Sequence, residues 1–119
     1  MIDWINIGVG ILTIAFGAFG FLAPRFTLEV LDLSPTRSTM GLSEARASVG
    51  GLFVAMGLVA VITGAPWAYA AIGVAYTGAA AGRILSLVFD SPPMGKLALY
   101  FGIEAACATW LLWANWSAL

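Results

Sequence analysis

The chain has 119 residues, of which 61% are hydrophobic and 9% charged, and its mean hydropathy is +0.98. Soluble domains carry about 25% charged residues, so this composition excludes an ordinary soluble domain and predicts a protein of the lipid bilayer. The net charge of −1 gives no basis for a nucleic-acid partner. Histidine is absent and Cys107 is the single cysteine, so no metal site, disulfide framework or cofactor is expected.

Four apolar segments follow one another along the chain, and each approaches the length of about 20 helical residues that crosses a hydrocarbon core. They cover residues 4–23, 45–63, 67–89 and 97–116. The first is interpreted as a retained span, because Asp3 stands where a cleaved signal peptide carries cations. Short connections force the last three spans to run antiparallel to their neighbours. The predicted fold class is all-α, an integral membrane antiparallel four-helix bundle in which residues 1–119 form a single transmembrane domain.

The connection between the first two spans, residues 24–44, carries much of the charge. Within it, Phe26, Val30 and Leu33 recur at helical spacing, which predicts a short helix at the membrane interface. A loop with scattered apolar residues is the alternative. Ser43 has the chemistry of an N-cap for the second span, because its hydroxyl can accept a hydrogen bond from a free backbone N–H.

The cations predict the orientation of the spans. All of them lie in or beside the first and third connections: Arg25, Arg37, Arg46, Arg83 and Lys96. By the positive-inside rule these two connections are cytoplasmic and both termini lie on the other side of a cell inner membrane. Tryptophans then gather near the non-cytoplasmic interface, where this residue is usually an anchor: Trp67, Trp110, Trp113 and Trp116.

Charged residues also lie within the spans. Arg83 is about 9 Å inside the cytoplasmic boundary and Glu104 about 10 Å, at 1.5 Å per helical residue. Glu44 and Arg46 open the second span at the same side. An unpaired charge costs up to about 3 kcal/mol in lipid on insertion scales, so we expect contacts among these four residues. Tyr100, one turn before Glu104, can place its hydroxyl near that carboxylate.

This predicted charge cluster has two interpretations. In one it is structural, and buried ion pairs decide which helix lies beside which. In the other it binds an anionic or polar headgroup or takes part in proton transfer. Small residues beside it predict close helix packing, at Gly50 and Gly51 on the second span and at Gly78 and Gly82 on the third.

Two motifs support a resemblance to a known family: Glu44-Ala-Arg46-Ala-Ser-Val-Gly50-Gly51, and one helix later Gly82-Arg83-Ile-Leu-Ser86. The pattern E-x-R-A-x-x-G-G followed by G-R-x-x-S resembles an uncharacterised family of small bacterial four-helix membrane proteins with a domain of unknown function. The resemblance covers nearly the whole chain, adds Ser86 to the candidate cluster and implies no activity. A looser similarity to DoxX-like membrane proteins rests on architecture alone.

Three functions remain open. The first is a non-enzymatic membrane protein, an accessory subunit or homo-oligomer, whose buried charges hold the helices together. The second is a binder or carrier of a small amphiphile, a lipid or quinone, at the charge cluster. The third is an enzyme or redox-complex partner that uses Glu104 and Tyr100 as acid and base, and the lack of histidine, metal ligands and a nucleotide loop disfavours it.

Overall fold

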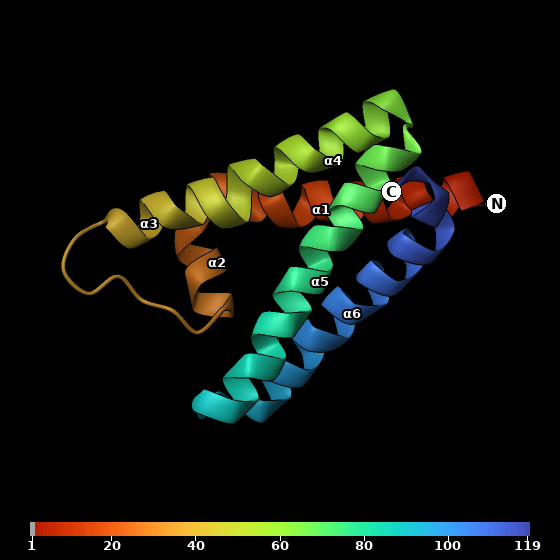
Figure 1. Ribbon diagram of the computed structural model, residues 1–119. Helices are drawn as coiled ribbons and strands as arrows, with labels where there is room; N and C mark the ends of the chain where they lie inside the picture. Colours follow the sequence, from red (N-terminus) through yellow and green to blue (C-terminus); the bar gives the residue numbers. More distant parts are fainter. Residues whose placement is uncertain (1) are drawn as a thin grey trace. The chain divides into compact units, whose positions relative to one another are not determined.

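The computed structural model describes residues 2–119, without the side chain of Ile2, and every regular element in this range is a helix. In chain order the elements are α1 (Ile2–Leu22), α2 (Pro24–Val30), α3 (Met40–Glu44), η1 (Ala45–Gly51), α4 (Leu52–Thr63), α5 (Pro66–Phe89), α6 (Met94–Asn115) and η2 (Trp116–Ala118) (Figure 1). The all-α fold class is therefore confirmed.

Four of the helical segments are long and apolar enough to cross a membrane. They are Asp3–Leu22, the continuous run Met40–Thr63, Pro66–Phe89 and Met94–Ala118. Each matches one predicted span, and the second and fourth begin several residues earlier than predicted. The chain is a multi-pass membrane protein.

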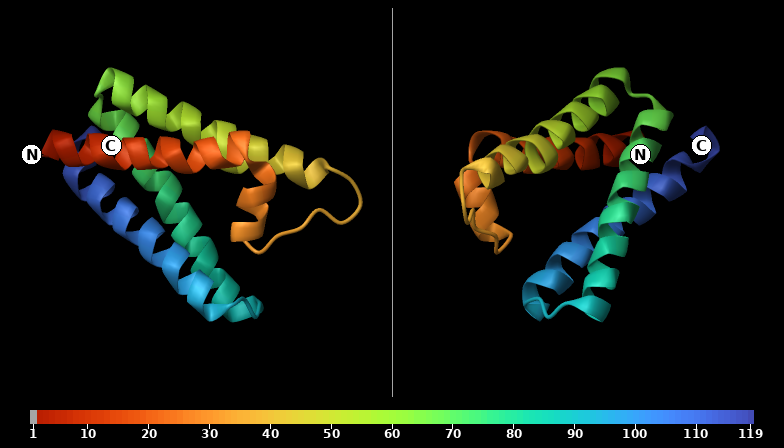
Figure 2. Two further views of the ribbon diagram at one scale, coloured as in Figure 1. Left: turned by 180° about the vertical axis from the view of Figure 1, so that it is seen from behind. Right: turned by 60° about the vertical axis from the view of Figure 1, so that its left-hand side comes forward.

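The chain divides into two compact units, Asp3–Gly64 and Ala65–Leu119. The first unit holds α1 to α4 and the second holds α5, α6 and η2. Each unit contains one hairpin of long helices, and the two helices of each hairpin lie side by side in both views of Figure 2. The prediction of a single domain is not tested by this division and stays a prediction.

Contacts between glycines and backbone fix the register of the first hairpin. A Cβ added at Gly17 would lie 2.7 Å from the backbone nitrogen of Val54, and one added at Gly57 would lie 3.1 Å from the carbonyl oxygen of Gly10. The partner residue therefore rises in number as its counterpart on α1 falls, so the two helices are antiparallel. Such close approach is how membrane helices gain packing energy without a hydrophobic driving force.

A short helix does connect the first two spans, as predicted, but its bounds differ. It begins at Pro24, because proline is well tolerated in the first turn, where its missing N–H is not needed. It ends at Val30, and Asp32 has a positive φ of 63°, which the helix cannot contain. Leu33 therefore lies beyond α2 and does not extend its apolar face.

The predicted N-cap Ser43 is wrong. The second span begins one turn earlier, at Met40, and Ser43 lies inside α3. Its backbone N–H donates to the carbonyl of Thr39, while the hydroxyl of Ser38 accepts from the N–H of Met40. The polar residues directly before this helix are Ser38 and Thr39, and Thr39 is the N-cap.

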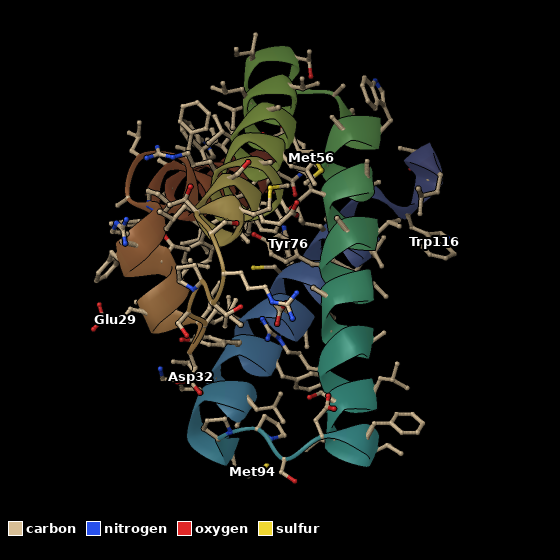
Figure 3. All side chains as sticks on the ribbon, turned by 90° about the vertical axis from the view of Figure 1, so that its left-hand side faces the viewer. Glu29, Asp32, Met56, Tyr76, Met94 and Trp116 are labelled. Atoms are coloured by element: carbon tan, nitrogen blue, oxygen red, sulfur yellow. The ribbon has the colours of Figure 1, made fainter. Side chains whose placement is uncertain are left out.

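The second hairpin packs through side chains. A Cβ at Gly73 on α5 would lie 3.0 Å from Cβ of Leu111 on α6, and Leu111 is fully buried. Helix α5 begins with Pro66 in its first turn, after Gly64 has reversed the chain in the left-handed conformation with φ 64°. Met94 and Trp116, labelled in Figure 3, mark the turn and the far end of this hairpin.

Candidate functional site

An ion pair joins the two helices of the second hairpin. Nε of Arg83 on α5 donates to Oε1 of Glu104 on α6 over 2.7 Å. The Glu104 side chain is only 12% exposed, whereas that of Arg83 is 34% exposed. Both residues lie well inside segments that span the membrane. The two opposite charges neutralise each other there, which lowers the cost of placing each in an apolar medium.

Tyr100 adds an aromatic surface to this pair. The guanidinium carbon of Arg83 lies 5.4 Å from the centroid of the Tyr100 ring, within the range of a cation–π interaction. Tyr100 precedes Glu104 by one helical turn on α6, so both residues reach α5 from the same side. Arg83 therefore contacts one carboxylate and one aromatic ring, both supplied by α6. Cys107 is buried further along the same helix as a free thiol.

Ser86 lies on α5, one turn beyond Arg83 toward the α5–α6 turn, and is half-buried. Its hydroxyl has no hydrogen-bond partner among residues 2–119. The two terminal nitrogens of the Arg83 guanidinium, Nη1 and Nη2, likewise find no acceptor in the described part of the chain. The hairpin thus binds one edge of the guanidinium and leaves the other edge available.

The other two members of the predicted cluster, Glu44 and Arg46, lie in the first unit and have local partners there. Nη1 of Arg46 donates to the carbonyl oxygen of Phe21 over 2.7 Å. The hydroxyl of Ser48 donates to Oε2 of Glu44 over 2.6 Å. Phe21 lies in the last turn of α1, where carbonyls have no partner within the helix and carry partial negative charge. Arg46 therefore caps α1, while its contact with Arg83 or Glu104 stays a prediction.

These two residues lie at the start of a π-helix, η1, that the sequence did not predict. It covers Ala45–Gly51, and the N–H of Leu52 that follows it donates to the carbonyl of Ala47, five residues earlier. π-Helical turns are rare and often occur at functional sites. The E-x-R-A-x-x-G-G motif thus runs from the last residue of α3 through the whole of η1.

The paired glycines of this motif differ in their surroundings. A Cβ at Gly50 would lie 2.5 Å from the backbone nitrogen of Phe21, which no side-chain movement can relieve. A Cβ at Gly51 would lie 3.6 Å from the Phe21 ring, an ordinary contact. Gly50 is therefore one of the positions at which the second span touches α1, and it lies next to Phe21, whose carbonyl Arg46 binds.

Gly78 and Gly82 do not pack the second hairpin. A Cβ added at either position would meet no described atom within 4 Å, and both residues are exposed. The face of α5 that meets α6 contains Gly73 instead, about 140° around the helix from Gly78 at 3.6 residues per turn. Close packing of Gly78 and Gly82 against another helix stays a prediction.

Sequence reasoning predicted close packing at Gly50 but missed Gly10, Gly17 and Gly57, although a signal for them was present. Gly10 and Gly17 are seven residues apart on the first span, and Gly50 and Gly57 are seven apart on the second. Seven residues make about two helical turns, so each pair lies along one face of its helix. Matching pairs of this spacing on consecutive spans indicate the seam between them. The Phe21 carbonyl that binds Arg46 had no signal, because any residue type supplies that atom.

A hollow of about 510 Å³ is lined by residues of α6 alone. Its lining holds no charged residue and consists of Ala105, Ala106, Thr109, Trp110 and Trp113. The rings of Trp110 and Trp113 lie 5.5 Å apart and are tilted by 52°. Among residues 2–119 no group of three or more metal-ligating side chains comes together. The hollow therefore does not include the ion pair between Arg83 and Glu104.

Comparison with known families assigns the chain. The sequence matches the family described as Domain of unknown function (DUF4345) over residues 1–115. The chain belongs to this family. No curated protein and no solved structure is significantly similar to it. The match agrees with the resemblance to an uncharacterised family, whereas the looser similarity to DoxX-like proteins stays an expectation. Membership in the DUF4345 family brings no activity to the residues described above.

Proposed function

We propose that this DUF4345 protein is a small non-enzymatic protein of the bacterial inner membrane, an accessory subunit or a structural and interaction protein. The observation that carries the proposal is the hydrogen-bonded ion pair between Arg83 and Glu104. Each charge serves as the partner of the other across two helices, which is the arrangement expected of a structural contact. In the first unit Arg46 and Glu44 are likewise engaged by neighbouring groups.

The proposal places both termini on the non-cytoplasmic side, and the support is the distribution of cations between the connections. The test uses a chain with Cys107→Ala and one new cysteine, either Ser91→Cys in the α5–α6 turn or Ser117→Cys near the C-terminus. A maleimide that cannot cross the membrane should label Ser117→Cys in intact cells and should label Ser91→Cys only after lysis. The reverse pattern would overturn the orientation.

The structural role is tested by removing both charges of the ion pair, with Arg83→Met and Glu104→Gln together. The protein is extracted in polymer-bounded native membrane discs, and co-purifying proteins and self-association are measured by mass spectrometry and native electrophoresis. We expect the double variant to remain folded and to keep the associations of the wild type. The matched control is Asp90→Asn with Lys96→Met, which removes one exposed charge of each sign, directly after α5 and in the first turn of α6. Loss of a specific partner in the first variant alone would contradict a purely structural pair.

A second candidate function is the binding or transport of a small amphiphile, a lipid or a quinone. It is favoured by one observation, the one-third exposure of the Arg83 side chain within a membrane-spanning segment. A charge used only to hold two helices together gains most when it is fully enclosed. Retention of a lipid or quinone by the purified wild type, lost on substitution of Arg83, is the measurement that separates this candidate from the first.

A further inference from the structure

The guanidinium of Arg83 has five N–H donors, and the hairpin uses one of them. Nε donates to Glu104, while Nη1 and Nη2 together carry four N–H groups that no described atom accepts. In water such donors would be solvated, but Arg83 lies within a membrane-spanning helix. An unsatisfied polar group in hydrocarbon costs several kcal/mol, so these donors require an acceptor that the bilayer itself can supply.

The depth of Arg83 determines which acceptor can reach it. Arg83 precedes Phe89, the last residue of α5, by six positions, which is about 9 Å along a helix. Arginine side chains at such depth extend toward the headgroup region while their alkyl part stays in the apolar layer. The strongest acceptors at that level are the phosphate oxygens of glycerophospholipids. A guanidinium binds a phosphate through two parallel N–H···O bonds, and its Nη edge has the geometry for this.

Ser86 is nearer than Arg83 to Phe89, the last residue of α5. It follows Arg83 by one turn on α5, so the two side chains are neighbours on the helix surface. Its unpartnered hydroxyl adds one donor to the same region. Beyond Ser86, Asp90 directly after α5 and Lys96 in the first turn of α6 are exposed and carry opposite charges, so they add no net charge.

We propose that the Nη edge of Arg83, with the hydroxyl of Ser86, binds the phosphodiester of a membrane glycerophospholipid while Nε holds Glu104. This proposal deepens the second candidate function and rests on it. The carboxylate of Glu104 orients the guanidinium, and the Tyr100 ring 5.4 Å from the guanidinium carbon restricts it from one side. The Nη donors recognise the oxygens of the phosphate group. The net charge of the whole headgroup contributes little, because the charges of Arg83 and Glu104 cancel at the site.

The test compares two lipids with the same acyl chains on the delipidated full-length protein, by native mass spectrometry. The probes are dioleoyl-phosphatidylglycerol and dioleoylglycerol, which lacks the phosphodiester. We expect the wild type to retain the phospholipid at least about tenfold better, since charge-assisted hydrogen bonds of this kind are worth about one decade or more in affinity. Equal retention of the two lipids would overturn the proposal.

Two variants with matched controls locate the site. Arg83→Lys keeps a charge for Glu104 but has no planar second edge, so phospholipid retention should fall about tenfold. Arg37→Lys makes the same change in the exposed connection and should leave retention unchanged. Ser86→Ala should weaken retention about threefold, on the scale of one neutral hydrogen bond, and Ser91→Ala should not. Unchanged retention in Arg83→Lys would overturn the assignment to Arg83.

A final arm distinguishes a lipid from free phosphate. Inorganic phosphate at millimolar concentration is added to the wild type loaded with phosphatidylglycerol. We expect it to displace little lipid, because the acyl chains contribute most of the binding free energy. Full displacement would overturn the lipid assignment and indicate an anion site open to water. The first candidate function is judged separately, by the associations of the double variant, so either can fail without the other.

Discussion

The two hairpins of this protein are held together by different means. In the first unit, glycines allow α1 to touch the second span backbone to backbone, at Gly17 and Gly20 on one side and Gly50 on the other. In the second unit, α5 and α6 are joined by side chains, with Leu111 buried and Arg83 paired with Glu104. The contact between α1 and the second span requires glycines, which have no side chain. The contact between α5 and α6 depends on apolar packing and an ion pair.

The arginines of the two units show the same contrast. Arg46 is exposed and binds a backbone carbonyl at the end of α1. Substitution of Arg46 should therefore destabilise only the C-terminal end of that helix. Arg83 is more enclosed and its partner is a carboxylate on another helix. Arg46 therefore caps one helix, whereas Arg83 joins two. Substituting each arginine separately should show how much each contact contributes to the free energy of unfolding.

The largest effect is expected at the glycine seam. Gly50→Leu would place side-chain atoms against the backbone of Phe21, which cannot move aside without shifting α1. Overpacking of this kind costs about 3 kcal/mol of unfolding free energy. The measurement is unfolding in mixed micelles by increasing dodecyl sulfate, followed by circular dichroism. Gly102→Leu on α6 is the control, because a Cβ there meets no described atom within 4 Å. Equal stability of the two variants would show that the seam does not hold α1.

The next effect is expected at the ion pair. Glu104→Gln leaves the Arg83 cation without its carboxylate, and we expect a loss of about 1–3 kcal/mol, less than for a fully buried pair because Arg83 is partly exposed. Adding Arg83→Met should restore most of the loss, since no unpaired charge then remains. A double-mutant cycle from the same dodecyl sulfate titrations measures the coupling. A coupling near zero would be inconsistent with a structural role for the pair.

A smaller effect is expected at the cap of α1. Arg46→Ala removes the hydrogen bond to the Phe21 carbonyl and a favourable charge at a helix C-terminus, together worth about 1 kcal/mol. The effect should be local, so amide hydrogen exchange at residues 19–23 should accelerate while α5 and α6 are unchanged. Arg37→Ala, in the exposed connection, serves as the control. Faster exchange across both units would contradict a purely local cap.

The smallest effect is expected within η1. Ser48→Ala removes the hydroxyl that donates to Glu44 on the exposed side of this segment. We expect a loss of about 0.5 kcal/mol, on the scale of a single exposed hydrogen bond. Thermal unfolding in polymer-bounded native membrane discs compares this variant with Ser38→Ala. The hydroxyl of Ser38 accepts a hydrogen bond from the N–H of Met40, at the start of the second span. A loss as large as that of Glu104→Gln would show that the π-helical segment depends on this bond.

Much of the fold could be predicted because composition and hydrophobic length are properties of single segments. The spans, the short helix before the second span and the all-α class all follow from the need to satisfy backbone groups in lipid. Their ends were less predictable. Ser43 has the residue type of a cap, yet the helix begins at Met40 with Thr39 as its N-cap. Several polar residues stand close together in that connection, so residue type alone could not select the cap.

The candidate site was predicted in part for a similar reason. Charges in a membrane must find partners, and Arg83 and Glu104 are opposite charges on consecutive antiparallel helices. Their pairing could therefore be predicted from the sequence. The hydrogen bond of Arg46 to Phe21 joins residues far apart in sequence and uses a backbone carbonyl. Every residue type has such a carbonyl, so the sequence could not predict this partner. The π-helix η1 likewise has no counterpart in the residue types of Ala45–Gly51 that would have predicted it.

By itself, the sequence determined that the chain is a membrane protein, how many segments can cross the bilayer and which charged residues within them need partners. These are consequences of solvation, which acts on each segment wherever it lies. Only the tertiary structure decided that Gly73 and not Gly78 faces α6, that Gly50 touches α1, and that Arg83 binds Glu104 through Nε, with no acceptor for its other nitrogens among residues 2–119. Those outcomes depend on the rotation of each helix about its axis, and contacts between helices set that angle.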